Sequence, residues 1–267
     1  MKRLAVFSIV ALMVVIITVK PLPIPAQAQM LQAIVGGGAN TKNLVGQWLV
    51  NEGGAATTVL DQSGHGNTGT WTGTASCTGS YYTTGYVLSY AGCPLGASYV
   101  ALSQTTGFPI GSAARSMSAW IYMTSVPSTW AGILAYGTTV TREGSILGVN
   151  VSSSKGYLQF SGYSDDFNSN LQIQLNTWYL ALFTYTAGAD FSGMKLYLNG
   201  STYTSSGGQG LNTINSTQRI GFHISNTLNK FPGYIEDVRL CSVAMGSQSA
   251  AALLANGPGG PNECFTN

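Results

Sequence analysis

A glycine-rich turn and a later acidic pair carry oxygen-bearing side chains suited to a calcium ion. The turn at residues 61–69, DQSGHGNTG, contains Asp61 and Asn67, and the later pair is Glu236 and Asp237. Carboxylate and amide oxygens are ligands that calcium takes from proteins, so these four residues form a candidate calcium site. A second interpretation stays open, in which Asp61 and Asn67 only cap the turn by hydrogen bonds to the backbone.

Aromatic residues in predicted turns are the second candidate for binding chemistry. A ring exposed in such a turn can stack on the face of a sugar, while nearby amides and carboxylates bind the sugar hydroxyls. The same rings can instead cover the ends of a β-sandwich, so packing stays an alternative. The candidate ligand-binding residues are Trp71, Tyr82, Trp130, Tyr163, Asp165 and Phe167, with Asp166, Asn168 and Asn170 near the last of them.

The acids and histidines show no recognisable catalytic motif. Hydrolysis of a glycosidic bond needs two carboxylic acids about 5 to 10 Å apart, and no E-x-D-x-E strand motif is present. Asp165 and Asp166 are neighbours, which would point to opposite faces of a strand. No G-x-S-x-G motif is present, and we interpret His65 and His223 as structural. The sequence therefore indicates a noncatalytic protein, with a polysaccharide-active enzyme as the weaker alternative.

Charge is sparse, and part of it lies at the N-terminus. The 267 residues hold 11 Lys and Arg against 9 Asp and Glu, without the basic cluster of a nucleic-acid binder. Residues 1–28 have the basic start, apolar run and Ala-Gln-Ala end of a secretory signal peptide. The apolar run at 4–19 is shorter than the roughly 20 residues of a membrane span. We therefore expect a secreted, nearly neutral mature chain with no membrane anchor.

Four cysteines remain after residue 28, and none has the CxxC spacing of a zinc or redox site. In an exported protein we expect two disulfides. Of the three possible connectivities we favour Cys77 with Cys93 and Cys241 with Cys264, because each pair closes a modest loop. The second bond would fix the C-terminal tail.

The expected elements are almost all strands. The segment 178–185 is apolar on both faces, which predicts a central strand covered on both sides, and Asn-Gly at 199–200 predicts a two-residue hairpin turn. We expect one helix at 248–255, with Ser247 as its N-cap and Gly257 just past its end. The expected strands are 116–123, 146–151, 157–161, 177–186, 193–199 and 219–224.

One domain at residues 44–257 accounts for most of the chain. Before it, residues 29–43 form an extension in which the apolar hexad 30–35 runs into three glycines. That hexad is either a frayed terminus or an extra strand able to pair with the sheet edge of a neighbouring subunit. After the domain, residues 258–267 form a tail.

Four separated segments together resemble the laminin-G-like, concanavalin A-like jelly-roll family. The resemblance implies two antiparallel sheets, with Trp48, Trp120 and Trp178 packed in the central strands. Members of the family are usually secreted, bind carbohydrate or other surfaces, and often hold calcium near the turn at 61–69. The matching segments are 44–53 (LVGQWLVNEG), 61–69, the central strands and hairpin at 117–121, 176–179 and 195–200, and 233–240 (GYIEDVRL) with the helix after it.

The closing strand of that resemblance, residues 233–240, gives Glu236 an unusual environment. Alternation places Glu236 on the core side with Val238. A carboxylate there must be paired, hydrogen-bonded or metal-bound, because burying an isolated charge is costly. On the outer face Arg239 can instead neutralise Asp237, which would weaken the calcium interpretation.

Taken together, the sequence predicts an all-β, two-sheet antiparallel jelly-roll sandwich with one short C-terminal helix. We expect a secreted noncatalytic module that binds carbohydrate or a cell-surface ligand, with a structural calcium. The alternative is a structural subunit of an extracellular filament or surface layer that assembles through residues 30–35.

Overall fold

The structure is a computed structural model that describes residues 42–50, 52, 57–72, 98–188, 190–205, 207–225, 230–262 and 264–266. Several predictions fall outside these residues: the signal peptide, the hexad 30–35, Tyr82, and the pair Cys77 and Cys93. None of the helices in the described residues is long and apolar enough to cross a membrane.

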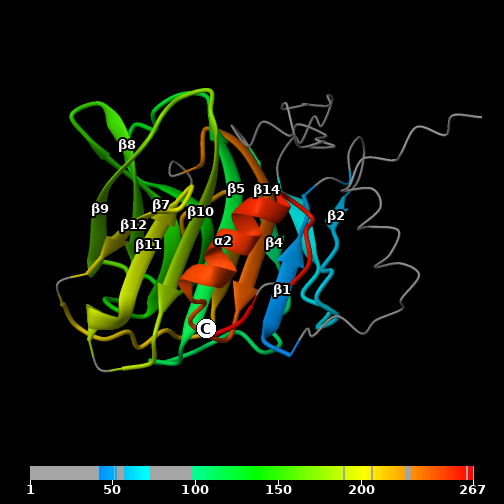
Figure 1. Cartoon of the computed structure of the whole chain (residues 1–267). Helices are drawn as coiled ribbons and strands as arrows, with labels where there is room; N and C mark the ends of the chain where they lie inside the picture. The colour runs from blue at the N-terminus through cyan, green and yellow to red at the C-terminus, as the bar shows by residue number, and fades with distance from the viewer. Residues whose placement is uncertain are drawn as a thin grey trace, which may run out of the picture.

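Two antiparallel sheets make up the described chain (Figure 1), as the sequence predicts. The six-stranded sheet has the order β1 (Leu44–Trp48), β14 (Gly233–Cys241), β5 (Arg115–Met123), β10 (Trp178–Tyr185), β11 (Met194–Leu198) and β12 (Ser201–Thr204). The eight-stranded sheet has the order β2 (Thr58–Val59), β3 (Gly69–Thr72), β4 (Tyr99–Leu102), β13 (Thr217–Ile220), β6 (Ala131–Gly137), β7 (Gly144–Ser152), β8 (Lys155–Ser161) and β9 (Asp166–Ile173). A short 3-10 helix, η1 (Phe191–Gly193), precedes β11.

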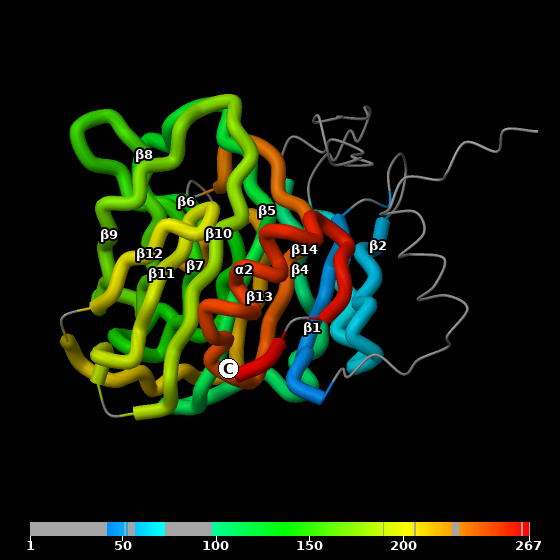
Figure 2. The backbone as a smooth tube through the Cα atoms, viewed as in Figure 1, coloured from blue at the N-terminus to red at the C-terminus, as the bar shows by residue number. Residues whose placement is uncertain are grey.

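The main core lies between the two sheets. Phe160 of β8 and Phe183 of β10 stack across it with ring centroids 3.7 Å apart, and Trp48 is fully buried at the other end. The predicted central strand is confirmed, since β10 pairs with both β5 and β11. Strands β1 and β14 come from opposite ends of the chain and lie side by side (Figure 2), which closes this edge of the sandwich.

A second apolar cluster covers the outer face of the six-stranded sheet. The helix α2 (Ser247–Asn256) packs Ala250 and Leu253 against Trp120 of β5 and Leu180 of β10 (Figure 1). The helix is confirmed, but its predicted N-cap is wrong, because Gly246 holds that position without a side-chain hydrogen bond. With one outer face covered by this helix, the outer face of the eight-stranded sheet is the other broad surface of the sandwich.

Local backbone conformations decide how two predicted elements end. The hairpin turn is confirmed: Asn199 and Gly200 both have positive φ, and β12 follows directly. The strand expected over 219–224 stops at Ile220 instead, because Gly221 has a φ of 79° and takes the chain out of the sheet. Residues 222–225 therefore leave the ladder, which leads His223 to the site described below.

A β-bulge in β14 changes which face its acidic residues occupy. The pairing with β5 slips between Glu236 and Arg239, and Asp237 has a φ of 45°. Ile235 and Val238 consequently both face the main core, and Glu236 lies on the outer face. The prediction that Glu236 shares a face with Val238 is wrong, because an extra residue in one strand shifts the alternation of side chains.

Candidate functional site

Backbone hydrogen bonds occupy the carboxylate of Asp61. Its Oδ1 accepts the backbone N–H groups of Gln47 at 3.0 Å and Ser63 at 2.9 Å. Its Oδ2 accepts the Ser63 hydroxyl at 2.8 Å and the backbone N–H of Asn67 at 2.9 Å. Asp61 thus connects the turn at 61–69 to β1 and accepts hydrogen bonds from backbone N–H groups within the turn.

Asn67 is equally occupied, by neighbours on two other segments. Its Nδ2 donates to the carbonyl oxygens of Val45 at 2.9 Å and Thr106 at 3.0 Å. Its Oδ1 accepts the backbone N–H of Thr106 at 2.9 Å, and the side chain is fully buried. This geometry is that of the turn-capping alternative.

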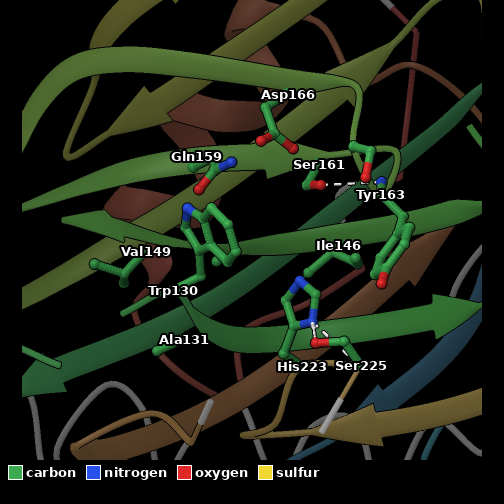
Figure 3. Close-up of a pocket in the computed structure, with 12 residues that line it drawn as sticks. Trp130, Ala131, Ile146, Val149, Gln159, Ser161, Tyr163, Asp166, His223 and Ser225 are labelled. Carbon is green, nitrogen blue, oxygen red and sulfur yellow. Dashed lines mark hydrogen bonds between the residues drawn. The ribbon is translucent and has the colours of Figure 1, made fainter. Parts of the chain in front are cut away.

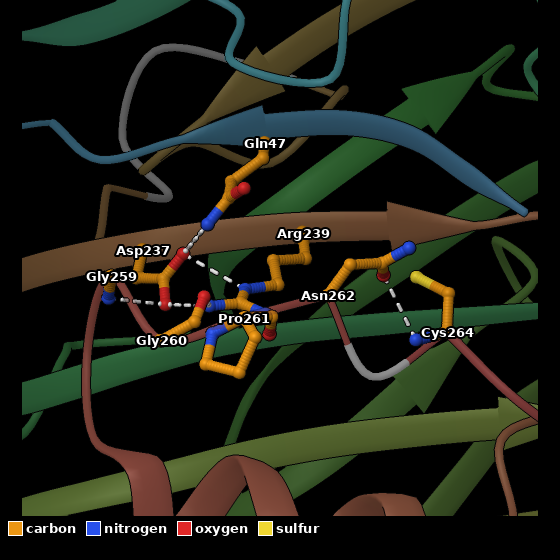
Figure 4. Close-up of polar contacts among 8 residues, drawn as sticks. All are labelled: Gln47, Asp237, Arg239, Gly259, Gly260, Pro261, Asn262 and Cys264. Carbon is orange, nitrogen blue, oxygen red and sulfur yellow. Dashed lines mark hydrogen bonds and ion pairs between the residues drawn. The ribbon is translucent and has the colours of Figure 1, made fainter. Parts of the chain in front are cut away.

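Asp237, from the acidic pair of the predicted calcium set, forms a buried ion pair with Arg239 (Figure 4). The Asp237 carboxylate accepts from Arg239 Nη2 at 2.6 Å and Nε at 2.9 Å, from Gln47 Nε2 at 2.9 Å and from the backbone N–H of Gly259 at 2.8 Å. The expectation that Arg239 can neutralise Asp237 on the outer face is confirmed.

The same arginine fixes the C-terminal tail. Arg239 donates to the carbonyl oxygens of Gly260 at 2.8 Å and Pro261 at 2.6 Å (Figure 4). The predicted disulfide between Cys241 and Cys264 is present and fixes the tail a few residues further on.

The four predicted calcium ligands do not form one cluster. Among the described residues no three His, Cys, Asp or Glu side chains are grouped so that they could hold a metal ion. The residues named for calcium therefore do not fit the ion as a set, and calcium binding stays a prediction.

Replacing Asp61 with Ala should lower the free energy of unfolding by about 2 kcal/mol, because several backbone donors lose a charged acceptor. Thermal melts with added calcium and with EDTA measure this loss. A turn cap gives the same loss in both media. Gln62→Ala, an exposed neighbour in the same turn, is the matched control. A loss that appears only with calcium present would instead support a metal at Asp61.

A hollow of about 120 Å³ opens on the outer face of the eight-stranded sheet (Figure 3). Trp130, which immediately precedes β6, forms one wall, and the loops at 162–164 and 222–225 form others. Its floor is the outward side of β7 and β8, where small residues such as Gly148 leave room. A side chain at Gly148 would collide with the carbonyl oxygen of Ala131, so the close approach of β6 and β7 requires glycine.

Gln159 and Ser161 of β8 are buried polar residues that line this hollow. Alternation along β8 sends Leu158 and Phe160 into the core and these two side chains outward. Ser161 Oγ accepts the backbone N–H of Tyr163 at 3.0 Å. The Gln159 side chain is only 4% exposed, and no described residue hydrogen-bonds to its amide. The amide is open to the hollow, so water or a ligand there can supply its hydrogen bonds.

His223 adds a neutral donor to the hollow. Its Nδ1 accepts the backbone N–H of Ser225 at 3.2 Å and lies 2.7 Å from the Ser225 hydroxyl. In the neutral ring the proton is then on Nε2, which points toward the interior of the hollow in Figure 3. Burial lowers the pKa of His223 to about 4, with the charge of Asp166 opposing this shift. The ring is therefore neutral at pH 7.

Two of the predicted ligand-binding residues meet in this hollow. Trp130 is 49% exposed and Tyr163 is half-buried, with its ring centroid 6.2 Å from that of His223. Asp166, on the outward side of β9, supplies a carboxylate beside them. The predicted ligand-binding residue next to it, Asp165, is not among the lining residues. Burial raises the pKa of Asp165, and the charge of nearby Arg142 opposes this shift.

Three predicted ring positions do not contribute to the hollow. Trp71 lies in β3 and packs against the main core. Phe167 lies in β9, is 5% exposed and contacts Tyr203 across 5.6 Å between ring centroids. Both were expected as exposed turn residues, and both expectations are wrong because the segments are strands whose inward positions these rings occupy. Tyr82 lies outside the described residues.

Sequence reasoning missed Gln159, Ser161 and His223 as members of the site. The alternation Leu158, Gln159, Phe160 in a predicted strand could have indicated an outward amide. Nothing local, however, shows that a tryptophan from a distant loop stands over it.

The chain belongs to the laminin G-like family of the concanavalin A-like lectin/glucanases superfamily, whose family model matches residues 95–251. A laminin G-like domain is a binding module. No sequence among curated proteins matches the chain.

Solved structures share this fold at low sequence identity. Domain 4 of AbnA, an extracellular arabinanase from Geobacillus stearothermophilus solved with arabinotriose, is 15% identical with a TM-score of 0.56, covering 79% of this chain and 98% of that one. A Trypanosoma rangeli sialidase in complex with sialic acid is 11% identical with a TM-score of 0.53, covering 80% and 33%.

A third similar structure belongs to botulinum neurotoxin type C, whose cell entry depends on two ganglioside molecules. It is 13% identical with a TM-score of 0.52, covering 80% of this chain and 51% of that one. This chain spans a third of the sialidase and about half of the toxin chain. At these identities the likeness shows the fold alone.

Proposed function

We propose that this protein is a secreted, noncatalytic module that binds carbohydrate in the hollow on the outer face of the eight-stranded sheet. One observation carries the proposal: the side-chain amide of Gln159 has no hydrogen bond to another described residue and lines a hollow walled by the exposed ring of Trp130. A sugar offers an apolar ring face and hydroxyl groups together, and it can satisfy both features at once.

The remaining groups of the hollow suit hydroxyl recognition. Asp166 can accept two hydrogen bonds from neighbouring hydroxyls, and the neutral His223 can donate one from Nε2. Charge-assisted bonds from a carboxylate are the stronger of these. Two-acid hydrolysis needs a pair of carboxyl groups. Among the described residues Asp166 is the one acid that lines this hollow, which supports a noncatalytic module.

Export is supported by the family and by one structural feature. The bond between Cys241 and Cys264 is of a kind that persists in oxidising compartments. From its family we expect the chain to bind a partner outside the cell. Two of the similar structures were solved with a saccharide, which supports a glycan as that partner. Comparing the N-terminus of protein recovered from the medium with the predicted cleavage after Ala28 tests this part.

Replacing Trp130 with Ala should weaken binding at least tenfold, about 1.4 kcal/mol, because a central aromatic contact is lost. A glycan array identifies the bound sugar, and isothermal titration then compares the two proteins. The thermal stability should stay unchanged, since the ring is half exposed. Ile110→Ala, which removes an exposed apolar side chain outside the hollow, is the matched control. Undiminished binding by the Trp130 variant would place the site elsewhere.

Replacing Gln159 with Met should weaken binding at least fivefold and leave the protein as stable as before or more stable. Met has a similar length but no amide to leave unpaired, so the free protein loses no hydrogen bond. Titration and urea unfolding of the same preparation measure both effects. A variant that is less stable by more than about 1 kcal/mol would mean that the amide has a structural role.

A further inference from the structure

Trp130 stands between two hollows that follow one another along β7. The first, described above, touches β7 at Ile146, Gly148 and Val149. The second touches β7 at Asn150 and Val151, and Ser128 and Thr129 complete its lining. In Figure 3 the Trp130 ring lies between the side chain of Val149 and those of Ile146 and His223, and Asn150 follows Val149 along β7. Both hollows share this one aromatic wall.

The size of the first hollow limits what it can hold. Its volume is about 120 Å³, below the roughly 300–1,000 Å³ of pockets that enclose a whole drug-sized ligand. The second hollow is shallower and has about 290 Å³. A single sugar unit therefore fills the first, and a longer chain has to continue across Trp130.

The charges lining the two hollows define the ligand further. In the described part of the chain the first hollow is lined by one carboxylate, Asp166, and by the neutral His223. The second is lined by hydroxyls, an amide and apolar atoms. No Lys or Arg lines either of them among the described residues. An acidic sugar would meet Asp166 without a Lys or Arg in the lining to balance it, and like charges at short range repel. Arg219, which donates to the carbonyl oxygen of His223 at 3.1 Å, and Arg142, whose charge acts on Asp165, are not lining residues.

Resting on the proposed function, we infer that the ligand is a neutral oligosaccharide of at least two units that lies across Trp130, with one unit over Gln159 and the next beside Asn150. The tryptophan then contacts both units, and the Asn150 side chain binds hydroxyls of the second. Specificity for chain length comes from the pair of hollows, and discrimination against acidic sugars comes from Asp166.

Titrations with linear saccharides of one to four units test the length requirement, using the arabinose, glucose and galactose series. Affinity should rise at least tenfold from one unit to two or three in the series that binds. Asn150→Ala should lower the affinity for the trisaccharide at least threefold and leave that for the single sugar unchanged. Because Asn150 begins an Asn-Val-Ser acceptor motif for glycosylation, Ser152→Ala is the matched control, since it removes the motif and keeps the amide.

Two pairs of ligands test the charge requirement. One pair is lactose and sialyllactose, and the other is a neutral oligosaccharide and a uronic acid oligomer. The neutral member of each pair should bind at least tenfold more tightly. Equal affinity for acidic and neutral sugars, or for one unit and three, would overturn this inference while leaving the carbohydrate site intact. If no saccharide binds, or if Trp130→Ala binds as well as the parent, the proposed function fails instead.

Discussion

Replacing Asp237 with Asn is expected to lower the free energy of unfolding by about 3–5 kcal/mol, the largest single effect that we predict. Asp237 is 2% exposed and its partner Arg239 is 1% exposed, so the substitution leaves a buried guanidinium without a counter-ion. Asn keeps a similar shape and tolerates the left-handed backbone found here, which separates the charge effect from backbone strain. Urea unfolding at pH 7 measures the loss.

A double-mutant cycle provides the control for this substitution. Arg239→Met alone should also destabilise the protein, because Asp237 then lacks its cation. The double variant Asp237→Asn with Arg239→Met should lose at least about 1 kcal/mol less than the sum of the single losses, since neither buried charge is left alone. Additive losses, or a loss below about 1 kcal/mol for Asp237→Asn, would contradict a buried and coupled ion pair.

Replacing Glu236 with Gln is expected to stabilise the protein at pH 7 by about 3 kcal/mol and to change little at pH 4.5. Glu236 is 5% exposed, and among the described residues its Oε2 has no hydrogen-bond partner. Burial raises its pKa from 4.5 to about 8, with a smaller contribution from the charge of Asp237. The folded chain therefore keeps a proton that the unfolded chain releases.

The sign of the pH dependence follows from that difference. Between pH 4.5 and about 8 the folded state binds more protons at Glu236 than the unfolded state does, so this residue makes the protein less stable as pH rises. Gln cannot ionise, and the variant should lose this part of the slope. Urea unfolding of both proteins at several pH values measures the difference.

Asp190→Asn is a control of opposite sign. Hydrogen bonds from Ser192 lower the pKa of this exposed carboxylate, so its small stabilising effect is lost as pH falls.

Equal pH profiles for the parent protein and Glu236→Gln would show that Glu236 has a partner in solution. The prediction for Glu236 would then be wrong.

Local signals in the sequence determined the elements of this protein well. The hairpin at 199–200 was predictable because both of its residues accept positive φ. The central strand β10 was predictable because its residues are apolar on both faces. The short strands β2, β3 and β4 were not expected, and neither were β6 and β9. Strand β6 is rich in small residues, and β9 is largely polar, because its outward positions carry Asp166, Asn168 and Asn170.

The candidate site was predicted only in part, for a physical reason. Trp130 and Tyr163 could be chosen because rings among Gly, Ser and Thr are frequent on loops. Phe167 has the same local surroundings, yet it lies in the core, since its position in β9 turns it inward. Sequence neighbours decide whether a segment is extended, whereas register against other strands decides which of its side chains face the core.

By itself the sequence predicted a β-sandwich of the laminin G-like kind, favoured the disulfide between Cys241 and Cys264, and left turn-capping by Asp61 as one of two alternatives. Only the tertiary structure decided that a bulge turns Glu236 outward, that Asp61 caps its turn while Asp237 pairs with Arg239, and that Trp130 stands over Gln159 and His223. Propensity and alternation act over a few residues along the chain. A site, in contrast, is made of side chains from β6, β8, β9 and a distant loop, and their proximity comes from strand pairing over long sequence separations.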